Sequence, residues 1–285
     1  MNNKDNNKNK NKNKKLIPLN DHAFKRMFGE KGQELSLITI FNGLTCRTGE
    51  NAAKSITIKE RVIPRELYDD KQVELDVHAT TDKNERINIE AQIKNIDMKG
   101  RGAYYASKML SKGLEKGQCY SELQNIIRIT IFGTRSRTRD NYENYYKYER
   151  TNEYTEQYEF VLPNFDLLEN KDINNLQHRC LMFLSPNTEE NMRKKVIEME
   201  PGLAKAQEML DYINSSPEEL ELYEMRERVR RDIEDARKND LQEGKEMEKI
   251  EIVLNSMKEN IPIETISKIT GLSVEKIQKL KQHQE

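Results

Sequence analysis

The sequence predicts an α/β fold with a mixed sheet flanked by helices, followed by an all-helical C-terminal extension. Segments with alternating apolar and polar residues and segments with helical apolar spacing come in the order helix, three strands, helix, strand. Only helical patterns remain beyond residue 186. Of the 285 residues 35% are hydrophobic, and these about a hundred apolar side chains are enough for one or two ordinary domains.

The first helical pattern follows a tail that carries almost no apolar residues. Residues 1–15 consist nearly entirely of Asn and Lys and cannot offset the entropy of ordering, so we expect a disordered basic tail, with a nucleic-acid-binding arm as the alternative. Residues 16–43 then predict two helices or one kinked pair, which Asn20 or Asp21 can cap. Apolar residues recur there at helical spacing on both sides of Gly32: Phe24, Met27, Phe28, Leu35, Ile38 and Phe41.

Four segments predict strands, and one helix lies between the third and the fourth. Alternating or continuous apolar residues mark these strands: residues 56–58, 73–79, 86–94 and 126–132. The helix, over residues 100–117, has an apolar face that we expect to be buried: Ala103, Ala106, Leu110 and Leu114. Alternation at residues 159–162 and 179–184 predicts further strands or a hairpin that extends the sheet.

The C-terminal extension is predicted to be helical throughout: residues 188–200, 203–214, 217–260 and 261–280. The long charged segment carries a narrow apolar stripe, which indicates a solvated helix or a weak coiled-coil seam: Leu222, Met225, Val229, Ile233 and Ala236. The last segment predicts two short helices, because Gly271 can end one and Ser273 can cap the next.

Composition excludes several classes of protein. Lys and Arg number 48 and Asp and Glu 49, for a formal net charge of -1, so a histone-like coat is excluded and nucleic-acid binding needs a local basic face. Cys46, Cys119 and Cys180 are too far apart for a disulfide framework or a zinc cage, which favours a reducing cytoplasm. No segment has the roughly 20 apolar residues of a membrane helix, and the start has no secretory core. We therefore expect a cytoplasmic, soluble protein.

Two neighbouring predicted strands place polar residues on one face of the sheet. Residues 73–79 put Glu74, Asp76 and His78 opposite an apolar face, and residues 87–94 do the same with Asn88, Glu90, Gln92 and Lys94. An antiparallel hairpin must pair apolar with apolar residues, and a turn centred on Lys83 satisfies this rule. The expected cross-strand pairs are three: Asp76 with Glu90, Glu74 with Gln92 and His78 with Asn88.

The pairing of Asp76 with Glu90 predicts a metal site. Carboxylates opposite one another in a strand pair have Cβ atoms roughly 4.5 to 5.5 Å apart and destabilise the sheet. A hard divalent cation such as Mg²⁺ or Mn²⁺ compensates, because it prefers a few carboxylate oxygens with water and substrate phosphate. The alternative is a solvated polar sheet face with an accidental acid pair.

The helix after this hairpin carries a basic stripe: Arg101, Tyr105, Lys108, Lys112 and Lys116. Neutralising the phosphates of a nucleic acid requires such a surface, although an ordinary solvated helix face has a similar composition. The stripe therefore supports nucleic-acid binding only in combination with the neighbouring acid pair.

These motifs, in this order, resemble the PD-(D/E)XK nuclease superfamily, and more narrowly its recombination-promoting nuclease or transposase branch. The residues that carry the resemblance are Asp76 on one strand, Glu90-Ala91-Gln92 on the next, and Arg101, Tyr104, Tyr105, Ser107 and Lys108 on the helix. The beginning, residues 20–29, and the end, residues 269–273 with Ile277, are also similar to that branch. The resemblance covers about residues 16–285.

The resemblance implies a restriction-endonuclease-like core and Mg²⁺-dependent hydrolysis of DNA phosphodiesters. Asp76 and Glu90 would be metal ligands, with the carbonyl of Ala91 as a further candidate. Asp21 would be an additional acidic group from the first helix, with a simple N-cap as the alternative. The implied domains are a nuclease-like domain (16–185), a helical extension (186–260) and a small helix-turn-helix-like motif (261–285).

Gln92 is the main departure from the superfamily pattern, which usually has Lys there. A lysine would stabilise developing phosphate charge, whereas a neutral glutamine can orient a water molecule but supplies no cation. Lys94, on the same face, is a candidate source of that charge.

Together these features predict a Mg²⁺-dependent DNA endonuclease with little sequence specificity, associated with DNA recombination or mobile elements, in which Mn²⁺ can replace Mg²⁺. Arg101, Lys108 and Lys112 would bind the DNA backbone, and Tyr105 would stack or bond to phosphate. The helix pair at residues 261–280 is the candidate for base reading, and homodimerisation or partner binding through the long helix and the C-terminal helices is the alternative. The alternative is a catalytically degenerate nuclease fold that acts as a DNA-binding or protein-interaction module.

Overall fold

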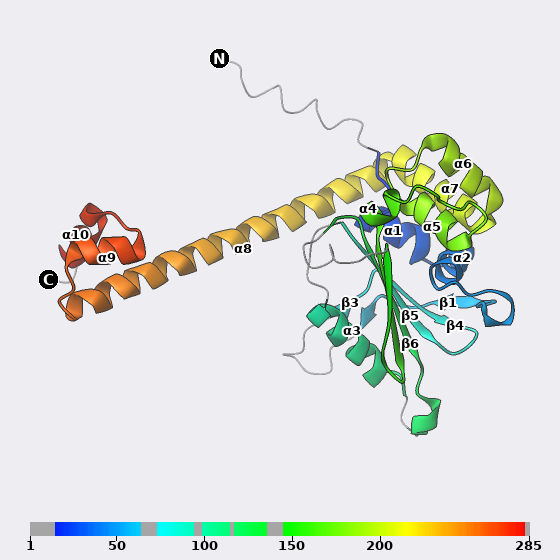
Figure 1. Ribbon diagram of the computed structural model, residues 1–285, viewed down its shortest axis with the longest axis horizontal. Helices are drawn as coiled ribbons and strands as arrows, with labels where there is room; N and C mark the ends of the chain where they lie inside the picture. Colours follow the sequence, from blue (N-terminus) through cyan, green and yellow to red (C-terminus); the bar gives the residue numbers. More distant parts are fainter. Residues whose placement is uncertain (1–14, 64–72, 94–98, 115–116, 136–144, 283–285) are drawn as a thin grey trace, which may run out of the picture. The chain divides into compact units, whose positions relative to one another are not determined.

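The computed structural model describes five stretches of the chain (Figure 1): residues 15–63, 73–93, 99–114, 117–135 and 145–282. Two compact units are formed, one that ends at Glu219 and one that begins at Leu220. Apart from Lys15, the expected basic tail lies outside the described residues. Across those five stretches, no helix has both the length and the apolar character to span a membrane.

The first unit contains a six-stranded mixed sheet in the order β1-β4-β5-β6-β8-β7. Neighbours are antiparallel except for β5, β6 and β8, which run parallel. In chain order the strands are β1 (Ile56–Ile58), β4 (Val77–Thr81), β5 (Arg86–Gln92), β6 (Ile126–Phe132), β7 (Tyr146–Asn152) and β8 (Thr155–Val161). A separate antiparallel ribbon joins β2 (Val62–Ile63) and β3 (Val73–Glu74). The predicted α/β class, with a mixed sheet flanked by helices, is confirmed.

The middle of the sheet is buried on both faces, as its sequence indicates. All seven residues of β6 are buried: α3 packs on this strand, and the central parallel strands of a sheet are typically covered on both faces. Arg128 and Thr130 are the polar residues of this buried strand. The predicted strands at residues 56–58 and 126–132 are confirmed, and the strand predicted at 86–94 is β5, with Lys94 outside the described residues.

Helices of the first unit gather beside the sheet, and Figure 1 shows α3 (Lys99–Ser111) apart from the others. Helix α2 contacts β1, α5 and α7, and α1 contacts α2, α7 and β5. The grouped helices are α1 (Asp21–Phe28), α2 (Glu34–Leu44), α4 (Leu162–Asp166), α5 (Leu176–Leu184), α6 (Glu190–Met199) and α7 (Pro201–Ser215). Two short 3-10 helices cover Gly49–Asn51 and Tyr120–Glu122.

One local prediction in this unit is wrong. Residues 179–184 belong to helix α5 rather than to a strand, because Asn175 caps the helix with its side chain and an apolar run of buried residues continues to Leu184. Of the two predicted cap residues, Asn20 caps α1: its side chain accepts from the backbone N–H groups of His22 and Ala23, so Asp21 is not a simple N-cap. The two predicted N-terminal helices, α1 and α2, are confirmed.

The second unit is a small helical core at the end of α8 (Pro217–Lys258). Helices α9 (Ile263–Thr270) and α10 (Val274–Gln282) pack on α8 through three fully buried residues: Val253, Ile266 and Ile277. Gly271 ends α9 in the left-handed conformation with φ 69°, and Ser273 Oγ accepts from the N–H of Lys276. The predicted pair of short helices is confirmed.

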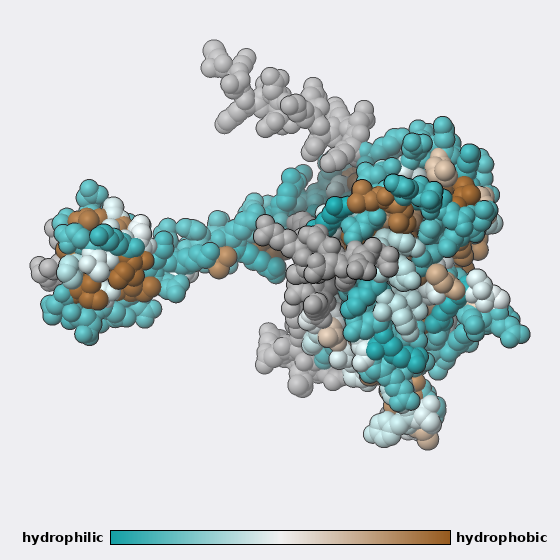
Figure 2. All heavy atoms as spheres, viewed as in Figure 1, coloured by the Kyte–Doolittle hydropathy of each residue, from teal (hydrophilic) through white to brown (hydrophobic). Residues whose placement is uncertain are grey.

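The predicted apolar stripe on α8 is exposed to solvent. Met225 and Val229 are each 54% exposed, and Ile233 is 48% exposed. Figure 2 shows a mainly hydrophilic surface along this helix. These residues therefore fit a solvated helix, and use of the stripe as a coiled-coil seam stays a prediction.

Candidate active site

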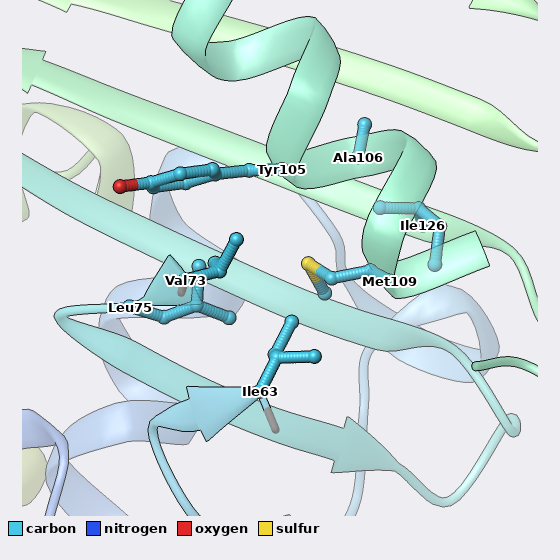
Figure 3. Packing of buried hydrophobic residues seen from close by; sticks show 7 residues of the cluster. All are labelled: Ile63, Val73, Leu75, Tyr105, Ala106, Met109 and Ile126. Carbon is cyan, nitrogen blue, oxygen red and sulfur yellow. The ribbon is translucent and has the colours of Figure 1, made fainter. Parts of the chain in front are cut away.

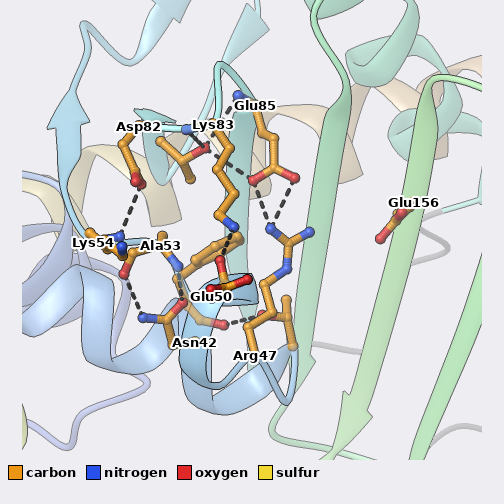
Figure 4. A network of polar contacts seen from close by, with 12 residues as sticks. Asn42, Arg47, Glu50, Ala53, Lys54, Asp82, Lys83, Glu85 and Glu156 are labelled. Carbon is orange, nitrogen blue, oxygen red and sulfur yellow. Dashed lines mark hydrogen bonds and ion pairs between the residues drawn. The ribbon is translucent and has the colours of Figure 1, made fainter.

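The β4–β5 hairpin has the register that the sequence predicts. Val77 pairs with Ile89 and His78 with Asn88, which places the turn around Lys83. Thr81 Oγ1 and the positive φ of Asn84 shape this turn. Arg47 from the α2 side pairs with Glu85 at 2.7 Å and holds the turn in place (Figure 4).

The strand predicted at residues 73–79 is broken, and this break forms the site. β3 ends at Glu74 and pairs with β2, the chain bends at Asp76, and β4 begins at Val77. The predicted pairing of Glu74 with Gln92 is therefore wrong. Burial still alternates along the segment, because Val73 and Leu75 pack under α3 while Val77 lies in the main sheet.

Because of the bend, the Asp76 carboxylate lies beside the end of β5 that extends beyond its last pair with β4, Val77 with Ile89. Its Oδ2 accepts from the N–H of Ala91 at 3.1 Å, and the N–H of Asp76 points to Glu90 Oε1 at 3.4 Å. Both carboxylates are buried: Asp76 is 6% and Glu90 1% exposed. The predicted neighbours thus lie side by side, away from bulk water.

Burial and mutual repulsion make this pair hold protons tightly. Burial raises the pKa of Glu90 to about 8, together with the charge of Asp76, and Arg101 only partly opposes the shift. Burial also raises the pKa of Asp76 to about 6, against the effect of Lys25. Neighbouring buried carboxylates resist ionisation because their two negative charges repel each other. A bound cation would neutralise these charges, so such a pair favours cation binding.

Helix α1 adds one cation and one carboxylate to the site. Lys25 Nζ lies 3.3 Å from Asp76 Oδ1, 3.0 Å from Asp21 Oδ1 and 3.8 Å from Glu74 Oε1. Burial lowers the pKa of Lys25, but the charges of Asp76 and Asp21 outweigh burial and the pKa lies above its ordinary value. Asp21 is exposed, and its ion pair with Lys25 connects it to Asp76.

Gln92 lies beside Glu90 at the end of β5. Gln92 is buried, and its Nε2 is 3.5 Å from Glu90 Oε2, at the outer limit of a hydrogen bond. Lys94, the sequence-based candidate for the missing charge, lies outside the described residues.

The buried face of α3 is only partly the predicted one. Tyr105, Ala106 and Met109 join the core cluster that β2, β3 and β6 line (Figure 3), Leu110 packs against this cluster, and Ala103 is exposed. The large side chains of Tyr105 and Met109 bury more apolar area than alanines do, and this sets the orientation of the helix.

Tyr105 therefore does not belong to an exposed basic stripe, which corrects the predicted surface. Tyr105 is 8% exposed, and its hydroxyl accepts a hydrogen bond of 2.8 Å from Arg101 Nε. Burial lowers the pKa of Arg101, but the charges of Tyr105, Glu90 and Asp76 raise it above its usual value. Lys108 follows on α3 and Lys112 lies directly after its end, both partly buried, and Lys116 lies outside the described residues.

Sequence reasoning did not identify Arg128 on β6. Arg128 is 3% exposed, and its Nη1 donates to Gln157 Oε1 at 2.9 Å. Burial lowers the pKa of its guanidinium, against the charges of Glu90 and Glu159. The guanidinium packs against Gly102, where a Cβ atom would overlap it. A single charged residue in a strand that is otherwise apolar except for Thr130 was the signal available in the sequence.

The donor set fits a hard cation. Ala91 presents its N–H, and therefore its carbonyl, to the edge of β5 where Asp76 lies. Among the residues that the structure describes, no three or more His, Cys, Asp or Glu side chains form a group that could hold a metal ion. Two carboxylates and a carbonyl leave most positions to water and substrate, as Mg²⁺ prefers, and do not suit zinc.

Comparison with known proteins gives one match. The model of a family described as PD-(D/E)XK nuclease family transposase matches residues 18–258. This range includes Asp21, Asp76, Glu90 and the α3 residues. No curated protein and no solved structure matches the chain significantly.

Proposed function

The chain belongs to the PD-(D/E)XK nuclease family transposases, and from this membership we propose that it is a Mg²⁺-dependent DNA endonuclease with little sequence specificity. One observation carries the proposal: two buried carboxylates, Asp76 and Glu90, adjoin at the open end of β5 with raised pKa values. A carboxylate pair of this kind costs folding stability, and a divalent cation with its phosphate substrate offsets that cost.

The proposed ligands are the Asp76 and Glu90 side chains and the Ala91 carbonyl. Bound there, Mg²⁺ would supply Lewis-acid stabilisation of phosphate charge and acidify water, and Mn²⁺ would do the same. The oxygen of the attacking water would form a bond to phosphorus and lose a proton to solvent. The bond from phosphorus to the 3′-oxygen would break, and that oxygen would leave as a hydroxyl after taking a proton from solvent. The amide of Gln92, beside Glu90, would orient that water.

The proposed DNA contacts come from the basic residues of α3. Arg101 lies close enough to Glu90 and Asp76 for their charges to raise its pKa. It would therefore bind the phosphate next to the scissile bond. Lys108 and Lys112 would bind neighbouring phosphates along the strand. Tyr105, which is buried, would position Arg101 rather than stack on a base.

The wider setting also remains part of the proposal. Contacts to phosphates alone give little sequence specificity, which suits a cytoplasmic enzyme of DNA recombination or mobile elements. The exposed apolar stripe of α8 and the C-terminal helices would support a homodimer.

A second function, from a different class, is a degenerate nuclease fold that binds DNA or a protein partner without cutting. Gln92 favours this alternative, because it offers no cation where the superfamily usually has lysine. Binding that survives the loss of both Asp76 and Glu90, with no cleavage by the parent protein, would establish it.

Cleavage of supercoiled plasmid by the full chain tests the proposal, with Mg²⁺, Mn²⁺, Ca²⁺ or EDTA. Nicking with Mg²⁺ or Mn²⁺ is expected, and Asp76→Ala and Glu90→Ala should each reduce it by at least about 10²-fold. Glu153→Ala, in the exposed β7–β8 turn, is the matched control and should cut at the parental rate. Equal nicking by all four proteins would assign the activity to a contaminant and overturn the proposal.

A further inference from the structure

We propose that Lys25 of α1 is the catalytic cation of this site and replaces the lysine that is missing at Gln92. The inference rests on the proposed nuclease function and adds a residue from another element to it. Lys25 would contact a non-bridging oxygen of the scissile phosphate and stabilise the charge that develops there.

The first support is the position of the ammonium group. Lys25 Nζ lies 3.3 Å from Asp76 Oδ1, while the other oxygen of this carboxylate, Oδ2, accepts from Ala91 N–H. The lysine thus contacts one oxygen of Asp76 and the backbone of β5 the other, so Lys25 reaches the same carboxylate that is proposed to bind the metal ion. Its side chain is 16% exposed, so it sits at the rim of the site, where a substrate phosphate can reach it.

The second support is the way α1 is fixed against Asp76. A Cβ atom at Gly29 would lie 2.9 Å from the carbonyl oxygen of Asp76, so only glycine allows this close approach of the helix end. One turn earlier, Lys25 therefore has a defined position relative to the Asp76 backbone. Asn20 caps the start of the helix, and Arg26 pairs with Glu219 at 2.6 Å on its other side.

The other cations beside the acid pair are held in different roles. Arg128 is 3% exposed beneath Gly102 and bonded to Gln157, so a phosphate cannot reach it. Arg101 is bonded to the Tyr105 hydroxyl on the α3 side of the site. Lys25 approaches from α1 and supplies a compact charge with three donors, which is what the lysine of the superfamily motif supplies.

Three negative charges keep the ammonium in place before substrate binds. Asp21, Glu74 and Asp76 all lie within 3.8 Å of Lys25 Nζ. Asp21 then has a role of its own: it positions Lys25, rather than binding the metal directly.

The test uses the full chain in two assays: plasmid nicking with Mn²⁺ and calorimetric Mn²⁺ binding. Lys25→Gln should nick at least about 10²-fold more slowly and bind Mn²⁺ as tightly as the parent or more tightly, because a positive charge beside Asp76 is gone. Adding Gln92→Lys to Lys25→Gln should restore the rate at least about tenfold, since the lysine returns to the motif position. Lys31→Gln, in the exposed turn after α1, is the control and should match the parent in both assays.

Lys25→Arg addresses folding, because it keeps a charge beside Asp76. It should show the parental far-UV circular dichroism and nick faster than Lys25→Gln. Parental nicking by Lys25→Gln, or equal loss of Mn²⁺ binding and nicking without rescue by Gln92→Lys, would make Lys25 a structural ion-pair partner and overturn the inference. Absence of nicking by the parent would instead overturn the proposed function itself, and the role of Lys25 with it.

Discussion

At the scale of single residues, the Asp76–Glu90 pair is the reason for proposing a cation in the site. Two carboxylates with almost no exposed surface lie on adjoining strand ends, and Lys25 and Arg101 compensate their charge in part. Such a pair is unfavourable to folding and favourable to metal binding, because the bound ion replaces the protons that burial would otherwise retain.

Glu90 gives the metal-free protein a defined pH dependence. Its folded pKa of about 8 lies above the ordinary value of 4.5, so its proton stabilises the folded state. That contribution is fully present below about pH 4.5 and is lost as pH rises toward 8. Glu90→Gln should therefore raise the metal-free Tm at pH 8 by roughly 3–8 °C and change it little at pH 4.5. Calorimetry of both proteins in EDTA measures this, and parallel Tm curves would refute it.

Lys108 should contribute to DNA affinity through a phosphate contact. Lys108→Gln should weaken binding to any duplex and reduce the slope of log K against log salt by about 1, because one fewer counterion is released. Fluorescence anisotropy at several salt concentrations, with Ca²⁺ in place of Mg²⁺, measures the slope. Lys194→Gln on α6 serves as the control; a loss of the same size there would mean that the effect is not specific to α3.

At the scale of elements, the sequence reports burial more reliably than pairing. Alternation in residues 86–94 and the apolar run in 126–132 predicted β5 and β6. Both predictions succeeded because each strand stays in the same sheet along its whole length. Val73, Leu75 and Val77 are buried as predicted, yet between them the chain changes its pairing partner from β2 in the separate ribbon to β5 in the main sheet. The alternation of apolar and polar residues continues across this change of partner. The break at Asp76 therefore cannot be predicted from the hydrophobic pattern.

Only part of the candidate site could be predicted from the sequence, because local patterns do not show which distant elements meet. The turn around Lys83 fixed the register and hence the approach of Asp76 to Glu90. Lys25 and Arg128 come from α1 and β6, and no local spacing connects them with the hairpin. The buried face of α3 was also predicted only in part. Its apolar residues can be grouped into two overlapping faces, and the large side chains of Tyr105 and Met109 decide which one is buried.

Close packing of α2 and α7 provides a test of the fold at this scale. A Cβ atom at Gly202 would lie 2.6 Å from the backbone oxygen of Leu35 and would also overlap Thr39. Gly202→Ala should lower the free energy of unfolding by about 1–3 kcal/mol, since the helices must move apart. Gly244→Ala on α8 meets nothing within 4 Å and should be neutral or stabilising. Urea unfolding distinguishes the two, and equal effects would contradict the close approach of α7 to α2.

At the scale of the whole molecule, the chain separates into two units near the start of α8. Glu219, the last residue of the first unit, binds His22 at 2.9 Å and Arg26 at 2.6 Å. Helix α1 thus depends on the first turn of α8, while the rest of α8 is largely exposed.

Truncation should reveal this division. A chain that ends at residue 222 keeps Glu219 and should retain the Tm of the first unit within about 3 °C. A chain that ends at residue 216 loses Glu219, leaves the buried His22 and Arg26 without this partner, and should unfold at least about 3 °C lower. Identical Tm values for both chains would show that the Glu219 contacts do not support α1.

Calorimetric titration of Mn²⁺ into the metal-free full chain at pH 8 tests most directly whether Asp76 and Glu90 form one metal site. If they do, the parent and Glu153→Gln should bind Mn²⁺, and Asp76→Asn and Glu90→Gln should each bind it at least about tenfold more weakly. Equal Mn²⁺ affinity in all four proteins, or no binding by the parent, would contradict a shared site.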